Sequence, residues 1–221
     1  MTEQEIAKSV ESISRQYRIY IAVLRDALTD VKRQGFVLSK NTFVSILNDH
    51  VGYHFSAIQK EIVEAFSEIS TDKIKNEAPS FVFSDEQERR LDEFIGNNIK
   101  TLRDNILGQM SSDSVKIEGV YHKMRLASTM AETDFNFDYL DRGGRKWDST
   151  RYIETESRYL IYDTWNTAMV YLLRVSGHKT AIYKRPGHEK DGKILNLDLY
   201  ESYVEELFHP NAYAFVAPLE D

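Results

Sequence analysis

The stretch from Arg142 to Gly177 constrains the fold more than any other part of the sequence. It opens with a turn at Gly143-Gly144, offers Asp148 and Ser149 as helix caps, and then contains no glycine or proline before Gly177. Two apolar stripes at three- and four-residue spacing follow it, namely Ile153, Ser157, Leu160, Thr164, Ala168, Tyr171 and Val175, and beside them Ile161, Trp165, Met169 and Leu172. A helix that is apolar on two faces is normally surrounded by other elements. The pattern therefore predicts the central helix of the C-terminal half, ending at a C′ glycine.

Two earlier segments carry matching heptad-like seams. They are Ile6, Val10, Ile13, Tyr17, Tyr20, Leu24, Ala27 and Val31, and then Phe43, Leu47, Val51, His54, Ile58, Ile62, Ala65 and Ile69. Because the turn around Gly35 is short, the two segments are expected to form an antiparallel helical hairpin. The hairpin is either a plain scaffold or an arm for oligomerisation or docking, since a long two-helix hairpin covers only part of its own apolar surface. On the second interpretation we expect Tyr17, Tyr20, Leu24, Trp147 and Trp165 to bind a partner.

The middle of the chain has fewer signals. Residues 71–83 are predicted to be a linker, because Pro79 disfavours helical geometry in the residue before it. Ser84 followed by Gln87 is the pattern of a capping box, which predicts a third helix that ends near Gly108. Residues 120–130 are expected to form a further short helix, and the acidic, aromatic residues 131–140 a loop.

The last third changes character after Gly177. Residues 179–184 and 193–199 are expected to be strands separated by a turn, residues 200–208 one or two helical turns, and the segment AYAFVA a final strand. The predicted fold is α+β and mostly α, with a long N-terminal helical hairpin, further helices, and a central helix packed on a small sheet. The predicted domains are 1–80, the helical hairpin; 81–141, the third helix and its connecting loops; and 142–221, an α+β module.

Composition excludes several functions. A net charge of −7 argues against strong nucleic-acid binding, which needs a large excess of Lys and Arg. The absence of cysteine excludes disulfides, thiolate metal sites and cysteine nucleophiles. The acidic, amphipathic start has no apolar core of a signal peptide, and no apolar run is long enough to cross a membrane. We therefore expect a protein made in the cytosol, without a membrane partner.

Titratable residues offer weak alternatives. His178, His188, His209 and Asp191 fall at turns and strand ends of the C-terminal module and are candidates for a zinc-like metal site, although histidines beside Gly and Pro are commonly turn residues. The segment HVGYH, from His50 to His54, lacks the glutamate of a metalloprotease motif. Glu156 and Asp163 share one side of the central helix and are interpreted as structural carboxylates. The expectation is a protein with no enzymatic activity, no metal and no cofactor.

The central stretch and the residues after it resemble a known family. The resemblance rests on the basic, aromatic residues 145–147, Arg151-Tyr152 before Thr155-Glu156, a strand after Gly177, His188, Asp191-Gly192 and the terminal His209-Pro210-Asn211. In these features the chain resembles the minor head proteins of tailed phages, the Mu F-like or head-morphogenesis group. The resemblance covers roughly residues 142–218. It departs from the family at Ala212 and Tyr213, where members often have cysteine or histidine.

The resemblance implies a structural protein of the virion. It would be a minor head or neck component that binds portal or major capsid subunits and has no catalytic activity. Assembly would take place in the host cytoplasm. Self-association through the helices is a further expectation. The alternatives are a helical adaptor or regulatory protein of a bacterium or mobile element, and a small metal-dependent enzyme that uses the C-terminal histidines.

Overall fold

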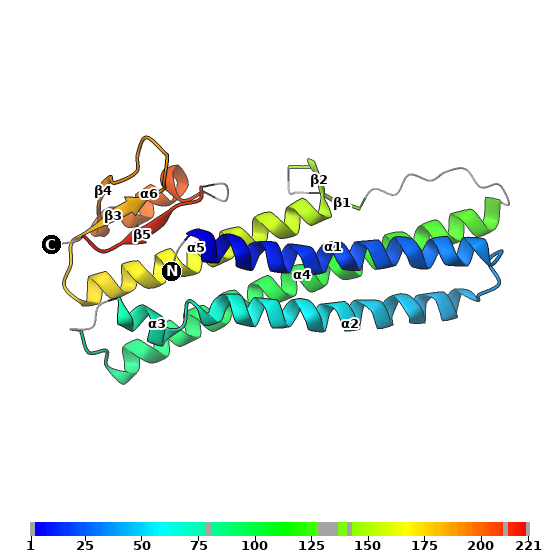
Figure 1. Cartoon of the computed structure of the whole chain (residues 1–221), viewed down its shortest axis with the longest axis horizontal. Coiled ribbons are helices and arrows are strands. Elements are labelled where there is room, and N and C mark those ends of the chain that lie inside the picture. The colour runs from blue at the N-terminus through cyan, green and yellow to red at the C-terminus, as the bar shows by residue number, and fades with distance from the viewer. Residues whose placement is uncertain (1–2, 78–80, 128–136, 141–142, 210–211, 220–221) are drawn as a thin grey trace. The chain divides into compact units, whose positions relative to one another are not determined.

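The computed structural model describes residues 3–77, 81–127, 137–140, 143–209 and 212–219 (Figure 1). The helices are α1 (Glu3–Arg33), α2 (Lys40–Ser67), α3 (Thr71–Asn76), α4 (Asp85–Ala127), α5 (Ser149–Val175) and α6 (Tyr200–Leu207), with a 3₁₀ turn η1 at Leu197–Leu199. The strands are β1 (Asp138–Leu140), β2 (Lys146–Asp148), β3 (Thr180–Lys184), β4 (Ile194–Asn196) and β5 (Phe215–Ala217). The predicted α+β, mostly α fold class is confirmed.

The chain groups into two compact units, each built from separated stretches of sequence. Unit 1 contains Met1–Val10, Ile62–Leu102 and Thr155–Asp221, and unit 2 contains Glu11–Glu61 and Arg103–Glu154. Helices α1, α2, α4 and α5 therefore each contribute to both units. The predicted domains are consecutive stretches of sequence, 1–80, 81–141 and 142–221, whereas each compact unit combines separated stretches. The division into domains stays a prediction.

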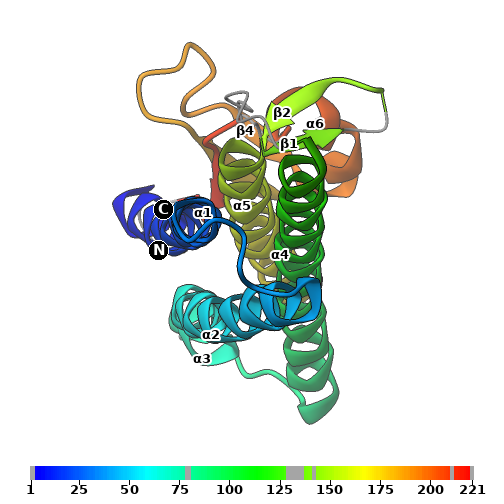
Figure 2. The ribbon, with the colours of Figure 1, turned by 90° about the vertical axis from the view of Figure 1, so that its right-hand side faces the viewer.

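The N-terminal helical hairpin forms as predicted. In Figures 1 and 2 a short turn, residues 34–39, joins α1 to α2. This turn uses the left-handed region at Gly35 (φ 65°) and at Phe36 (φ 58°), where a non-glycine residue is uncommon. In unit 2, Ser12 Oγ donates a hydrogen bond to Glu61 Oε2 and so joins the two helices. The buried side chains of unit 2 include most of both predicted seams: Ile13, Tyr17, Tyr20, Leu24, Val31, Phe43, Leu47, His54 and Ile58.

The linker predicted at residues 71–83 is wrong over its first half, which forms helix α3. Ser70 caps this helix, because its side chain accepts a hydrogen bond from the Lys73 N–H. Within unit 1, Ile74 is fully buried, and Thr71 Oγ1 donates a 2.5 Å hydrogen bond to Asp92 of α4. The proline restricts only its immediate neighbour, so it does not prevent a capped turn of helix several residues earlier.

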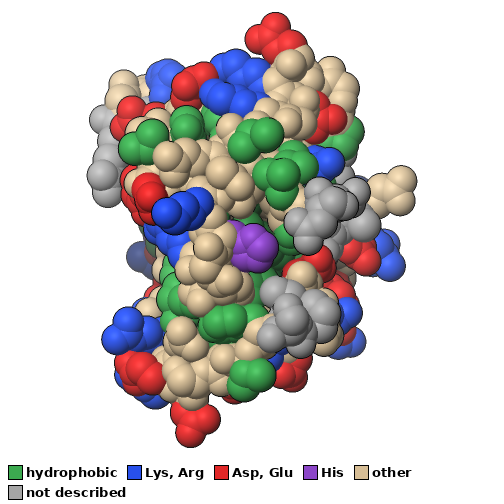
Figure 3. All heavy atoms as spheres, turned by 90° about the vertical axis from the view of Figure 1, so that its left-hand side faces the viewer, with side chains coloured by type: hydrophobic (Ala, Val, Ile, Leu, Met, Phe, Trp, Pro, Cys, Tyr) green, Lys and Arg blue, Asp and Glu red, His purple; other side chains and the backbone are tan. Residues whose placement is uncertain are grey.

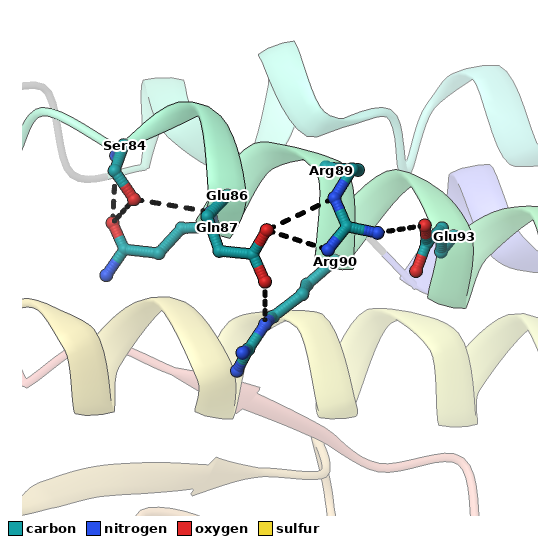
Figure 4. Close-up of polar contacts among 6 residues, drawn as sticks. All are labelled: Ser84, Glu86, Gln87, Arg89, Arg90 and Glu93. Atoms are coloured by element: carbon teal, nitrogen blue, oxygen red, sulfur yellow. Dashed lines mark hydrogen bonds and ion pairs between the residues drawn. The ribbon is translucent and has the colours of Figure 1, made fainter.

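Helix α4 starts where the capping box predicts but continues far beyond Gly108. The Ser84 N–H donates to Gln87 Oε1 at 2.9 Å, and the Gln87 N–H donates to Ser84 Oγ at 3.3 Å (Figure 4). The separate helix expected at residues 120–130 is instead the last part of α4, which ends at Ala127. A glycine inside a helix costs only about 1 kcal/mol, and a buried stripe spans the glycine positions: Ile106, Met110, Ile117 and Tyr121.

The C-terminal module of unit 1 consists of most of α5, a three-stranded antiparallel sheet and α6. The sheet has the order β4-β3-β5, and Gly177 (φ 84°) ends α5 as predicted. The strand predicted at 193–199 is shorter, because the Asn196 side chain accepts a hydrogen bond from the Asp198 N–H and the chain turns into η1. In a continuous strand Leu199 would share the face of Leu195 and Leu197, but after this turn it is 53% exposed.

Two α5 side chains close one edge of this sheet. Asn166, which is buried, donates from Nδ2 to the Ala214 carbonyl at 3.0 Å and accepts from the Val216 N–H at 2.8 Å. Trp165 Nε1 donates to the Val216 carbonyl at 3.3 Å. The outward backbone groups of β5 thereby find partners on α5, as buried backbone groups require.

Candidate functional site

A short hairpin in unit 2, which the sequence analysis missed, forms the most distinctive surface feature. Strands β1 and β2 are antiparallel, with Tyr139 opposite Trp147, and Gly144 (φ 76°) lies in the connection between them. The Ser149 N–H donates to the Phe137 carbonyl at 2.9 Å and extends the pairing. Phe137 is buried, and the Arg25 guanidinium of α1 lies 5.3 Å from the centre of its ring. A two-stranded hairpin is marginal alone, so Phe137 is its anchor.

Aromatic rings and arginines gather on this hairpin. Tyr139 stacks on Tyr152 of α5 with ring centres 3.8 Å apart and an interplanar angle of 13°. The guanidinium groups of Arg151 and Arg145 lie 5.3 Å and 6.0 Å from the centre of the Trp147 ring, within the range of cation–π attraction. We call these five residues the Trp147 surface; both arginines are exposed, and the three rings are half-buried.

The Trp147 surface is fixed in place by the start of α5. Asp148 Oδ1 accepts hydrogen bonds from the N–H groups of Thr150 at 2.9 Å and Arg151 at 3.2 Å. Asp148 is therefore the helix cap, one of the two candidates that the sequence offered. Because β2 ends at this same residue, the geometry of Trp147 is tied directly to that of Tyr152 and Arg151 one turn later.

A groove of about 490 Å³ lies between the two tyrosines and α4 in unit 2. Most of its lining residues carry polar groups: Asp104, Asn105, Gly108, Gln109, Ser112, Lys116, Tyr139 and Tyr152. This volume is within the roughly 300 to 1,000 Å³ of ligand sites, but such sites enclose most of the bound molecule, whereas this groove is open. It suits a segment of another protein better than an enclosed small molecule.

A buried carboxylate lies behind the groove. Asp113 of α4 is fully buried, and Tyr17 of α1 donates its hydroxyl proton to Asp113 Oδ2. Gln109 Nε2 donates to Asp113 Oδ1 at 2.9 Å, and Lys116 Nζ lies 3.4 Å from the same oxygen. Tyr20 is also fully buried and donates to the Met110 carbonyl at 2.6 Å. These contacts join α1 to α4 within unit 2.

Burial dominates the electrostatics of this network. It raises the pKa of the Asp113 carboxyl, while the bonds from Tyr17, Lys116 and Gln109 act in the opposite direction. Burial and then the neighbouring Asp113 charge raise the pKa of the Tyr17 and Tyr20 hydroxyls. Both tyrosines are consequently neutral donors, which suits a structural bridge better than proton transfer near neutral pH.

Four of the five residues that were predicted to bind a partner are buried within the two compact units. Tyr17, Tyr20 and Leu24 are fully buried inside unit 2, and Trp165 is 3% exposed inside unit 1. The sequence analysis expected the hairpin of α1 and α2 to leave part of its apolar surface exposed. In unit 2, however, α4 packs against the seam of α1 at Tyr17 and Tyr20. In unit 1, Trp165 of α5 points towards β5. Trp147 alone among the five retains an accessible ring.

The C-terminal histidines occupy ordinary positions in unit 1. His188 Nδ1 accepts a 3.2 Å hydrogen bond from the Lys190 N–H, and Asp191 Oδ1 accepts one of 2.8 Å from the Arg185 N–H, so both residues shape the β3–β4 turn. His178 follows α5, and His209 follows α6. In the part of the chain that the structure describes, no three His, Asp or Glu side chains are grouped to hold a metal ion.

The carboxylates of α5 lead to a second, much smaller polar site in unit 1. Burial raises the pKa of Asp163, and its charge contributes to raising the pKa of Tyr159 and Tyr200. These residues, with His209, line a cavity of about 10 Å³. Such a cavity has room for about one water molecule, so it does not fit an organic substrate.

Comparisons with protein-family models, with curated proteins and with solved structures find no match to this chain. No helix in the described ranges, residues 3–77, 81–127, 137–140, 143–209 and 212–219, has the length and apolarity to cross a membrane.

Proposed function

We propose that the protein is a structural component of a phage virion, a minor head or neck protein that binds portal or capsid subunits through the Trp147 surface. The observation that carries the proposal is the position of Trp147, half-exposed between Arg145 and Arg151. The resemblance to tailed-phage minor head proteins rests partly on the same stretch, because Arg145 to Trp147 and Arg151-Tyr152 are among its motif residues. The proposed localisation is the virion, after assembly in the host cytoplasm.

The composition of this surface suits protein binding. Trp, Tyr and Arg are the residues most enriched among interface positions that contribute at least about 2 kcal/mol. The Tyr139–Tyr152 stack and the Asp148 cap hold the surface in one conformation before binding. Such preorganisation reduces the entropy lost on association. The groove along α4 provides further hydrogen-bonding groups next to the aromatic centre.

The test is binding to purified portal and major capsid proteins from the phage whose genome encodes this chain. Trp147→Ala is expected to weaken binding about 30-fold, which corresponds to about 2 kcal/mol, because the ring is the largest accessible apolar group of the surface. Tyr53→Ala is the matched control, since Tyr53 is an aromatic residue of unit 2 that is 74% exposed and lies outside this surface. Circular dichroism of both variants checks that they fold.

Two outcomes contradict the proposal. If neither portal nor capsid protein binds at micromolar concentration, the virion role fails. If one of them binds and Trp147→Ala behaves as Tyr53→Ala does, the assignment of the surface fails while the virion role survives. Capture only of a regulatory protein encoded by a mobile element would favour the adaptor alternative.

A further inference from the structure

Two histidines of α2 lie one turn apart on the same face of the helix. His50 and His54 are separated by four residues, the spacing that places side chains above one another on a helix. Their ring centres are 6.2 Å apart, with an angle of 35° between the ring planes. Both residues belong to unit 2. At this spacing two imidazoles on a helix can ligate one metal ion.

The surroundings of His54 hold its ring but give its nitrogens no partner. The side chain is 8% exposed, and its ring centre lies 6.0 Å from that of Tyr20 on α1 and 5.1 Å from that of Tyr53. Within the described ranges of the chain, neither His50 nor His54 takes part in a hydrogen bond or an ion pair. Buried polar atoms normally have a hydrogen-bond partner, so the nitrogens of His54 are available to a ligand.

The two imidazoles also have the charge and the access that a ligand requires. Burial, and after it the neighbouring His50, lower the pKa of His54. A neutral imidazole keeps the nitrogen lone pair that a metal ion binds. His50 is half-buried, so its ring reaches the surface and an ion can approach the pair from its side.

The separation of the rings is compatible with one bridging ion. A zinc–nitrogen bond of about 2.1 Å and about 1.2 Å from nitrogen to ring centre place the ion about 3.3 Å from each ring centre. Two rings on one ion are therefore about 5.4 Å apart at a tetrahedral angle and about 6.6 Å apart when opposite each other. The observed 6.2 Å lies between these values. A small rotation of the His50 ring reaches the tetrahedral arrangement, while Tyr20 and Tyr53 hold that of His54.

We propose that His50 and His54 bind one divalent transition-metal ion of the zinc type, with water completing its coordination. Imidazole suits zinc, copper and nickel, whereas magnesium and calcium prefer oxygen ligands. No third His, Asp or Glu joins the pair among the described residues, so the protein supplies two ligands. The missing glutamate of HVGYH excludes the general base of a metalloprotease but not ion binding.

The bound ion connects two successive turns of α2 and stabilises the folded state, because it binds the folded chain better than the unfolded one. The site shares no residue with the Trp147 surface. It therefore does not depend on the virion role.

The test is calorimetric titration of the full-length protein, without an affinity tag, with zinc chloride and with magnesium chloride as the opposite ion. We expect one Zn²⁺ per chain, saturation by about 0.5 mM ion and a rise of the melting temperature with Zn²⁺ but not with Mg²⁺. Electron paramagnetic resonance of the protein loaded with Cu²⁺ is expected to show two nitrogen ligands.

Three variants locate the site. His50→Gln removes one ligand at a half-buried position and is expected to weaken Zn²⁺ binding about tenfold or more, because the second attachment of the ion is lost. Asp49→His combined with His50→Gln keeps the number of histidines but moves one away from the shared face, and is expected to bind as weakly as His50→Gln. His122→Gln is the matched control, since His122 of α4 in unit 2 lies 3.8 Å from Glu118 and is expected to contribute nothing.

Single histidines elsewhere on the surface are the rival sites. Figure 3 shows a histidine side chain at the surface of the face that it presents, and His178 and His209 of unit 1 are exposed. A lone imidazole holds an ion more weakly than a chelating pair. Binding at such residues would persist unchanged in His50→Gln, which separates the rival sites from the pair.

Four results would overturn the proposal. They are no binding of Zn²⁺ by the wild type at millimolar concentration, equal affinity of the wild type and His50→Gln, wild-type affinity in the variant with the displaced histidine, and fewer than two nitrogen ligands on bound Cu²⁺. The last measurement uses the wild type alone, so it decides the question even if a variant does not fold. Loss of binding in His122→Gln would assign the ion to α4 instead.

Discussion

Replacing Asn166 tests how α5 holds the last strand. The Asn166→Leu variant keeps a side chain of similar size but removes both the donor to the Ala214 carbonyl and the acceptor for the Val216 N–H. Both backbone groups are buried in the fold, and Ala214 and Val216 are 1% and 0% exposed. Leaving a buried polar group without a partner costs about 1 to 3 kcal/mol.

Two such groups together would cost about 2 to 6 kcal/mol. We therefore expect Asn166→Leu to lower the free energy of unfolding by about 3 kcal/mol, within this range. For a chain of this length, about 2 to 4 °C of melting temperature is lost per kcal/mol, so the melting temperature is expected to fall by about 6 to 12 °C. Thermal unfolding followed by circular dichroism measures this fall. Hydrogen exchange provides the local measurement, since the Val216 amide loses its acceptor and is expected to exchange faster.

Asn166→Asp separates the two bonds. The introduced carboxylate still accepts from Val216 but no longer donates to Ala214 near neutral pH. Burial raises the pKa of a carboxyl at this position, so the folded state binds the proton more tightly than the unfolded state does. The stability of this variant is consequently greatest at acidic pH and falls as the pH rises through the raised pKa.

The matched control is Asn97→Leu, at an exposed position of α4 in unit 1. It is expected to change the melting temperature by no more than about 2 °C. If Asn166→Leu left both the melting temperature and the Val216 exchange rate at their wild-type values, the reasoning that α5 closes the β5 edge would be wrong.

Two further predictions concern the helices. Because burial raises the pKa of Asp113, its contribution to stability is complete below the ordinary aspartic acid pKa and is lost as the pH rises through the raised pKa. Measured by urea unfolding between pH 4 and 8, the unfolding free energy of Asp113→Asn should therefore decline less with pH than that of the wild type, whereas the exposed Asp104→Asn should decline as the wild type does. Equal declines for Asp113→Asn and the wild type would contradict the assignment. Ser84→Ala removes the cap of α4 and should cost about 1 kcal/mol in chemical unfolding, while Ser111→Ala, at an exposed position inside α4, should be neutral or slightly stabilising.

Local signals in the sequence predicted many of the helix ends and their caps. Ser84 with Gln87, Asp148 at the start of α5 and Gly177 after it act through bonds or torsion angles within a few residues. Such interactions are encoded by neighbours in the chain, so they can be recognised without a structure. The glycine at position 108 was misleading because burial of the stripe around it outweighs the small cost of one helical glycine.

The hairpin at residues 137–149 left a weaker signal. Gly143-Gly144 marked a turn, and Tyr139 and Trp147 each lie four residues from Gly143. A comparison of possible hairpin registers around this turn could therefore have predicted that residues 138–140 pair with residues 146–148, which places Tyr139 opposite Trp147. The stack of Tyr139 on Tyr152 was not, since it joins a strand to a helix.

The sequence by itself determined that the chain forms long amphipathic helices followed by a small sheet, because hydrophobic periodicity and capping act over a few residues. Only the tertiary structure decided which apolar faces meet. It buried Tyr17 against Asp113, turned Trp165 and Asn166 towards β5, and left Trp147 and Ile194 accessible. The physical reason is that burial depends on which distant segments become neighbours, and an apolar residue has the same local pattern whether its own chain or a partner covers it.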